Sequence, residues 1–273
     1  MKKYILAMTL SMFMVGCGAG STSSSSSDGS GGMSGGSQSG KGGSMARFAI
    51  SGDYLYTLNK REITAFDITQ PSKPLPYTKD AVSWDVETLF SYGDYLFVGA
   101  EGGVYVYNKP TPSTGIELKA TYSHVRSCDP VVIEDGFAYV TLNNGSSCRI
   151  KGGRNALEVL DVQDPLSPKI SKNSAGVENS KNMIDPKGLG VDGNILFVCD
   201  GAGGLKVFDI NKTENNETNI TTVDLKFNRN STIDEVDCYD VITNNKNLIV
   251  SNGKDVRQYD YSALPMVELG RIK

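Results

Sequence analysis

The 273-residue chain carries a formal net charge of −4, from 27 basic and 31 acidic side chains, and contains no basic run. This balance argues against a nucleic-acid partner, because proteins that bind nucleic acids need clustered Lys and Arg side chains to displace counterions from phosphates. The 13 Tyr, 9 Phe and 30 Gly residues, with no long segment of helical periodicity, predict an all-β domain, and the roughly 230 residues after the N-terminal region suit a single one.

The N-terminus has the pattern of an export signal. Lys2 and Lys3 precede about a dozen apolar residues, a run too short to span a bilayer comfortably as a helix. The run ends in MVGC, which resembles the lipobox of bacterial lipoproteins, where the signal is cut before a cysteine whose sulfur carries a diacylglycerol. We therefore predict a signal peptide over 1–16 and a lipid on Cys17, although Met14 stands where Leu is usual and an ordinary exported protein is the alternative.

The segment after the lipidated cysteine is almost pure Gly and Ser. Residues 17–44 are predicted to form a disordered tether, because this composition cannot bury enough apolar surface to fold. Gly18 follows the cysteine where an Asp would favour the inner membrane of a typical Gram-negative cell. We therefore expect anchoring at the outer membrane, either surface-exposed or facing the periplasm.

The remainder, 45–273, reads as five copies of one unit. Each copy consists of an inner strand, a two-stranded hairpin and an outer strand. In chain order the predicted segments are 47–50, 52–68 and 74–79; 87–90, 93–108 and 115–121; 130–133, 135–162 and 168–172; 188–191, 193–210 and 219–225; and 239–242, 246–261 and 265–271.

The spacing of the copies predicts a β-propeller. Equivalent positions are separated by 41, 42, 58 and 52 residues, and they are Thr57, Val98, Val140, Val198 and Val250. A period above 40 with several short strands per unit is typical of propeller blades. We predict five blades of four antiparallel strands, in a ring that can close without strand exchange because the chain starts on an inner strand and ends on an outer one.

The pattern of a glycine, LFV, GGLKVFDI and a proline-bounded turn resembles the LVIVD repeat of bacterial lipoproteins and surface proteins that form β-propellers. The resemblance covers 45–273 and is weakest in the fifth unit, which lacks the second glycine and the proline pair. It implies a fold and a secreted or surface location, and no settled activity.

Four further cysteines would lie at one end of the ring. In an exported chain their default state is disulfide-bonded, and the alignment of the units brings Cys128 near Cys148 and Cys199 near Cys238. Two buried free thiols are the alternative for the second pair. No CxxC pair or Cys/His cluster is present, so we expect no metal; GAGG at 201–204 leads into a strand rather than a helix, so we expect no dinucleotide cofactor.

The starts of the inner strands would surround the mouth of the central channel, at the same end as the cysteines. The candidate binding residues there are Trp84, Asp85, His124, Arg126, Asp129, Asp185, Lys187, Asp237 and Asp240. They would form an acidic, partly aromatic funnel for a cation, a peptide or a sugar. In the alternative interpretation the aspartates cap turns and bond the local backbone.

One predicted loop, 209–221, is rich in Asn, Thr and Glu. It contains three Asn-x-Thr triplets, each with an acidic residue two positions earlier, at Asn211, Asn216 and Asn219. This pattern resembles the extended acceptor sequon of bacterial N-glycosylation; a polar turn is the alternative.

These features favour a non-enzymatic, lipid-anchored protein that binds a protein or glycan at the envelope or cell surface. The alternatives are a periplasm-facing assembly scaffold, and a hydrolase or lyase that uses the acidic mouth, since fold alone does not decide function.

Overall fold

The structure is a computed structural model that describes residues 43–83, 86–111, 113–123, 130–144, 155–171, 183–217 and 220–273. All of them belong to one compact unit, Gly35–Lys273. The signal peptide, Cys17 and most of the predicted tether lie outside the described residues. Within the described ranges, no helix has the length and apolar character needed to span a membrane.

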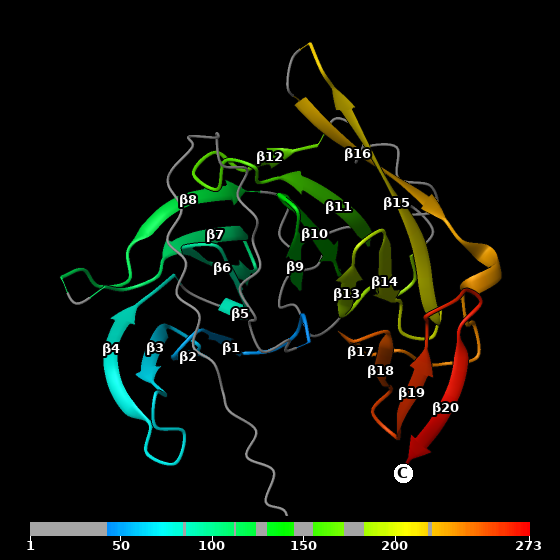
Figure 1. The fold of residues 1–273 in the computed structure, drawn as a ribbon, viewed down its shortest axis with the longest axis horizontal. Helices are drawn as coiled ribbons and strands as arrows, with labels where there is room; N and C mark the ends of the chain where they lie inside the picture. The colour runs from blue at the N-terminus through cyan, green and yellow to red at the C-terminus, as the bar shows by residue number, and fades with distance from the viewer. Residues whose placement is uncertain are drawn as a thin grey trace, which may run out of the picture. The chain divides into compact units, whose positions relative to one another are not determined.

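Five four-stranded antiparallel sheets follow one another along the chain, and each is one blade (Figure 1). Blade 1 contains β1 (Phe48–Ser51), β2 (Tyr54–Asn59), β3 (Glu62–Asp67) and β4 (Leu75–Ala81). Blade 2 contains β5 (Val86–Tyr92), β6 (Tyr95–Ala100), β7 (Gly103–Asn108) and β8 (Leu118–Ser123). Blade 3 contains β9 (Val131–Glu134), β10 (Phe137–Leu142), β11 (Ala156–Asp161) and β12 (Lys169–Ile170). Blade 4 contains β13 (Leu189–Asp192), β14 (Ile195–Cys199), β15 (Leu205–Asn215) and β16 (Ile220–Phe227). Blade 5 contains β17 (Asp240–Asn244), β18 (Asn247–Ser251), β19 (Val256–Asp260) and β20 (Val267–Ile272), and the short 3-10 helix η3 (Arg229–Ser231) precedes it.

Turn chemistry and apolar runs explain these boundaries. Gly93 and Gly193 occupy the first turns of blades 2 and 4 with φ of +53° and +59°, a conformation that glycine adopts without a steric cost. Strand β10 is buried at every residue, since neighbouring blades cover both of its faces. The predicted all-β propeller of five four-stranded blades is confirmed, and each blade is built from one contiguous segment.

The core consists of four hydrophobic clusters, and each cluster joins two consecutive blades. They join blade 1 to 2, 2 to 3, 3 to 4 and 4 to 5. The inner strands β1, β5, β9, β13 and β17 pack in the same succession. Among the described residues no corresponding cluster joins blade 5 to blade 1, and closure of the ring without strand exchange stays a prediction.

Two boundaries differ from the sequence prediction. Ser44, the last residue of the predicted tether, is buried and accepts a hydrogen bond from the Leu189 backbone N–H at 2.6 Å. Most of the predicted loop 209–221 is strand, because β15 runs to Asn215 and pairs with β16 as far as Ile220. In both places an ordered segment has the polar composition from which a tether or a loop is predicted.

Candidate functional site

The predicted mouth residues Asp185 and Lys187 are brought together at the start of β13. Their side chains form an ion pair at 2.9 Å, and the Lys187 ammonium lies 4.4 Å from the centre of the Tyr239 ring. The Asn143 carboxamide donates to Asp185 Oδ1 and to the Pro186 carbonyl, both at 2.7 Å. Asn143, Asp185, Lys187 and Tyr239, here the mouth cluster, therefore link blades 3, 4 and 5.

A fully buried carboxylate supports this cluster from below. Asp200 Oδ1 accepts the backbone N–H groups of Ile184 and Asp185, each at 2.9 Å. Its Oδ2 pairs with the ammonium of Lys206, on the other strand of the hairpin. Asp200 thus holds the segment that carries Asp185 and neutralises its own charge against Lys206.

The glycines of the turn 201–204 allow neighbouring groups to lie close to its backbone. A Cβ at Gly203 would overlap the Asp200 carboxylate, and one at Gly204 would overlap the Ile233 carbonyl. Gly201 and Cys238 exchange backbone hydrogen bonds at 3.1 and 3.0 Å, which fixes the segment before β17 against this turn. The GAGG motif is therefore a docking point for the link between blades 4 and 5.

The structure contains one of the two predicted disulfides. Cys199 at the end of β14 is bonded to Cys238 before β17, with the Cα atoms 4.8 Å apart. The bond joins neighbouring blades at the docking point of the GAGG turn. Cys128 and Cys148, the other predicted pair, lie outside the described residues.

Asp240 lies at the start of β17 beneath the N-terminal segment. Its Oδ1 accepts hydrogen bonds from the Val241 N–H at 3.0 Å and from the Ser44 hydroxyl at 3.3 Å. Burial raises the pKa of Asp240 to about 6, although these hydrogen bonds act in the opposite direction. At neutral pH the folded protein therefore contains the Asp240 carboxylate in an environment that disfavours its charged form.

This raised pKa predicts a stability that depends on pH. The unfolded chain releases the Asp240 proton near pH 4 and the folded chain near pH 6, so the free energy of unfolding falls as pH rises between these values. Two pK units correspond to about 3 kcal/mol. We expect Asp240→Asn to raise the free energy of unfolding at pH 8 by up to about 3 kcal/mol and to have little effect at pH 4, measured by urea unfolding. Asp237→Asn, at an exposed position, is the control; equal effects of the two variants at pH 8 would contradict the prediction.

The remaining mouth candidates separate into two groups. Asp237 is exposed and takes no part in the contacts of the mouth cluster. The others, Trp84, Asp85, His124, Arg126 and Asp129, lie outside the described residues. Sequence reasoning missed Asn143, Asp200, Tyr239 and Ser44. Of these, Asp200 had a signal, an acidic residue between a buried strand and a glycine turn.

Two carboxylates of the mouth, those of Asp185 and Asp200, are held by internal contacts. Asp185 is bound by Lys187 and Asn143, and Asp200 by Lys206 and backbone N–H groups. Within the described ranges no group of three or more His, Cys, Asp or Glu side chains is arranged to hold a metal ion. The part of the mouth that the structure describes is thus a rigid polar rim, on which Tyr239 and Ile184 are exposed.

A second candidate surface consists of the two blade faces, here the end faces, that share no hydrophobic cluster with another blade in the parts of the chain that the structure describes. Strand register places Phe48, Ile50, Leu55, Thr57, Thr64 and Phe66 on that of blade 1. It places Ile242, Ile249, Ser251, Val256, Gln258 and Ile272 on that of blade 5. Phe48 is 50% exposed, Ile249 36%, Val256 38% and Ile272 74%. Their apolar character contrasts with the polar side chains typical of a solvent-facing sheet.

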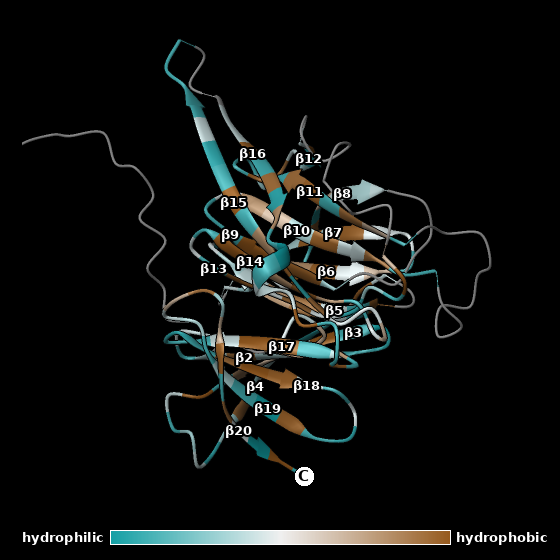
Figure 2. Ribbon diagram, turned by 90° about the vertical axis from the view of Figure 1, so that its right-hand side faces the viewer, coloured by the Kyte–Doolittle hydropathy of each residue, from teal (hydrophilic) through white to brown (hydrophobic). Residues whose placement is uncertain are grey.

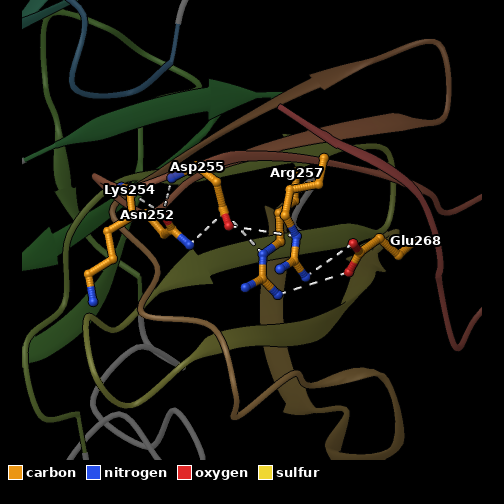
Figure 3. A network of polar contacts seen from close by, with 6 residues as sticks. Asn252, Lys254, Asp255, Arg257 and Glu268 are labelled. Carbon is orange, nitrogen blue, oxygen red and sulfur yellow. Dashed lines mark hydrogen bonds and ion pairs between the residues drawn. The ribbon is translucent and has the colours of Figure 1, made fainter. Parts of the chain in front are cut away.

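A polar network fastens the outer half of blade 5 (Figure 3). Asp255 Oδ1 accepts from Asn252 at 2.7 Å and from Arg257 at 3.2 Å, and Arg271 lies 3.6 Å from its Oδ2. Glu268 lies near both arginines, which ties β19 to the edge strand β20. The end face of blade 5 is therefore presented on a braced sheet.

A family model, the LVIVD repeat, matches residues 42–76, which include most of blade 1, and residues 185–228, which include all of blade 4. The chain therefore carries LVIVD repeats, as the sequence pattern indicated. No curated protein sequence matches it.

Solved β-propellers resemble the structure at low sequence identity. The periplasmic gluconolactonase PpgL of Pseudomonas aeruginosa aligns with a TM-score of 0.53 at 12% identity, over 81% of this chain and 67% of that one. The computationally designed Ika8 protein aligns with a TM-score of 0.51 at 13% identity, over 83% of this chain and 61% of that one. A luciferin-regenerating enzyme aligns at 0.50 and 14% identity, over 81% of this chain and 72% of that one. This chain thus spans about three fifths of the length of Ika8, and the likeness concerns the fold alone.

Proposed function

We propose that this propeller is a non-enzymatic, lipid-anchored envelope or cell-surface protein that binds a protein partner through its end faces. The observation that carries the proposal is the mismatch between five blades and four interblade clusters. Within the described ranges, these two partly apolar sheet faces lack the interblade cluster that the other blade faces share. Exposed apolar patches of this kind typically mark protein interaction sites.

The four internal interfaces indicate what such a face binds. Blade 4 covers the other side of blade 5 with Phe197, Leu205 and Val207, which pack against Val241 and Val250. The end face of blade 5 presents side chains of the same kind in the same strands, among them Ile242 and Ile249. A partner that offers an apolar β-sheet or hairpin face fits the apolar part of this surface.

The lipid anchor expected on Cys17 is part of the same proposal. A lipid on Cys17 and a Gly/Ser tether would keep the propeller near the membrane while leaving its end faces free to meet a partner. Asp185 of the mouth cluster is bound by Lys187 and Asn143, and the supporting Asp200 by Lys206 and backbone N–H groups, which favours a binding rather than a hydrolytic role. The outer membrane is the proposed location.

Site-specific photo-cross-linking in the native cell tests the proposal. We expect p-benzoylphenylalanine at position 249 or 48 to form a discrete protein adduct, while the same group at Leu118, an exposed apolar residue on β8, forms none. Ile249→Asp should reduce the adduct formed from position 48 about tenfold, because a charge in an apolar interface is costly to desolvate.

Further results of this experiment test the binding role and the side of the membrane. Adducts at 118 as abundant as those at 249, or no adduct at either end-face position, would count against the binding role. Protease treatment of intact cells before irradiation then assigns the side of the membrane: loss of the adduct places the propeller outside, and its survival until lysis favours the periplasm-facing scaffold.

A further inference from the structure

The hairpin of β15 and β16 extends beyond the rest of blade 4. Strand β15 pairs with β14 over Leu205–Asp209, and beyond this point it pairs, among the described strands, with β16 alone. Residues 211–215 and 220–224 therefore form a two-stranded ribbon, which projects past the neighbouring strands in Figure 1, and the outer part of its β15 strand is hydrophilic in Figure 2. It contributes to neither the mouth cluster nor the end faces.

The two faces of this ribbon differ in chemistry. Side chains alternate along a strand, so Asp209, Asn211 and Thr213 share one face. On the opposite face, Ile210 is buried in the cluster between blades 3 and 4, and the Lys212 ammonium pairs with Asp135 of blade 3. Asn211 and Thr213 are both exposed. The face opposite the packed one thus presents an acidic residue, an asparagine and a threonine at intervals of two, with the asparagine and the threonine exposed.

We propose that Asn211 is an N-glycosylation site. Its triplet, Asn211–Lys212–Thr213, is the acceptor signal for this modification, and Asp209 supplies an acidic side chain two positions earlier. The donor is an oligosaccharide linked to a polyprenyl diphosphate. The Asn211 carboxamide nitrogen forms a bond to the anomeric carbon, the bond from that carbon to the diphosphate oxygen breaks, the nitrogen loses one proton to a base of the transferase, and polyprenyl diphosphate leaves.

The ribbon meets the two physical requirements of such a site. A transferase needs local access to the backbone, and a two-stranded ribbon without a third strand opens at low cost. The product must fold with the glycan attached, and a side chain on the outward face loses no buried contact. Asn228 donates to Asp209 at 3.1 Å from the blade side, which leaves the distal part of the ribbon free.

Peptide mass spectrometry of the protein purified from its own cells tests the proposal. Trypsin cleaves after Lys206, Lys212 and Lys226, so Asn211 falls in peptide 207–212 while Asn216 and Asn219 fall in 213–226. We expect 207–212, or 207–226 if the glycan blocks cleavage at Lys212, to carry a saccharide mass that fragmentation assigns to Asn211. Recovery of 207–212 only in its unmodified form would overturn the proposal.

Three variants and one internal control separate modification from folding. Asn211→Gln and Thr213→Val should abolish the added mass, and Thr213→Ser should retain it. Asn230, in the triplet Asn230–Ser231–Thr232, has a neutral Asn228 two positions earlier and lies in η3. It should stay unmodified. Persistence of the mass on 207–212 in Thr213→Val would also contradict the proposal, because it would show a modification that does not read the triplet.

Discussion

Replacing both cysteines of the Cys199–Cys238 bond with alanine is expected to lower the free energy of unfolding by about 4 kcal/mol. The bond closes a segment with a sequence separation of 39, and closing a loop of this length removes that much chain entropy from the unfolded state. Both cysteines are fully buried between blades 4 and 5. Denaturant unfolding of the oxidised wild type and of the double variant measures the difference.

The effect is expected to be large because, within the described part of the chain, blade 5 shares a hydrophobic cluster with blade 4 alone. Blade 4 supplies its single interblade cluster, and the backbone bridges at Gly201 and Leu205 hold the segment that enters it. The double variant measured with and without reductant reports what the other cysteine pair, Cys128 and Cys148, contributes. Equal midpoints for the variant and the oxidised wild type would contradict the prediction.

The blade pattern was predictable because strand pairing is local. Alternating apolar residues, turn glycines and the repeat length specify four consecutive strands per blade, and each pairs with its neighbour in the chain. Ring closure depends on whether two blades at opposite ends of the chain cover each other. Phe48 and Ile249 occupy the same positions in the strand pattern as buried residues of other blades. The sequence pattern therefore did not predict that they are exposed.

The mouth was predictable in part for a similar reason. The repeat alignment placed Asp185, Lys187 and Asp240 at the same end of the ring, since each precedes or starts an inner strand. The alignment carries no information on side-chain partners from other blades, such as Asn143, or from Ser44 in a segment of linker composition. These contacts bind Asp185 to Asn143 and Asp240 to Ser44, which the repeat alignment alone could not predict.

Asp200→Ala is expected to lower the free energy of unfolding by about 3–5 kcal/mol, the usual range when one partner of a buried ion pair is removed. The variant leaves the mostly buried Lys206 ammonium without its counterion, and it deprives the backbone N–H groups of Ile184 and Asp185 of their acceptor. Since those two residues start the segment that carries the mouth cluster, the loss should also disorder the Asp185–Lys187 pair. Urea unfolding measures the first effect, and amide hydrogen exchange at 184–187 measures the second.

The matched control is Asp135→Ala, which removes an Asp–Lys ion pair with Lys212 at an exposed carboxylate and should cost less than about 1 kcal/mol. In Asp200→Asn/Lys206→Met the amide oxygen still accepts the two N–H groups and no unpaired charge remains, so most of the lost stability should return. Equal losses in the free energy of unfolding for Asp200→Ala and Asp135→Ala would contradict the prediction, because the buried ion pair would then contribute no more than the exposed one. If the double variant stayed as unstable as Asp200→Ala, the cost would come from lost packing around Gly203 rather than from the unpaired ammonium.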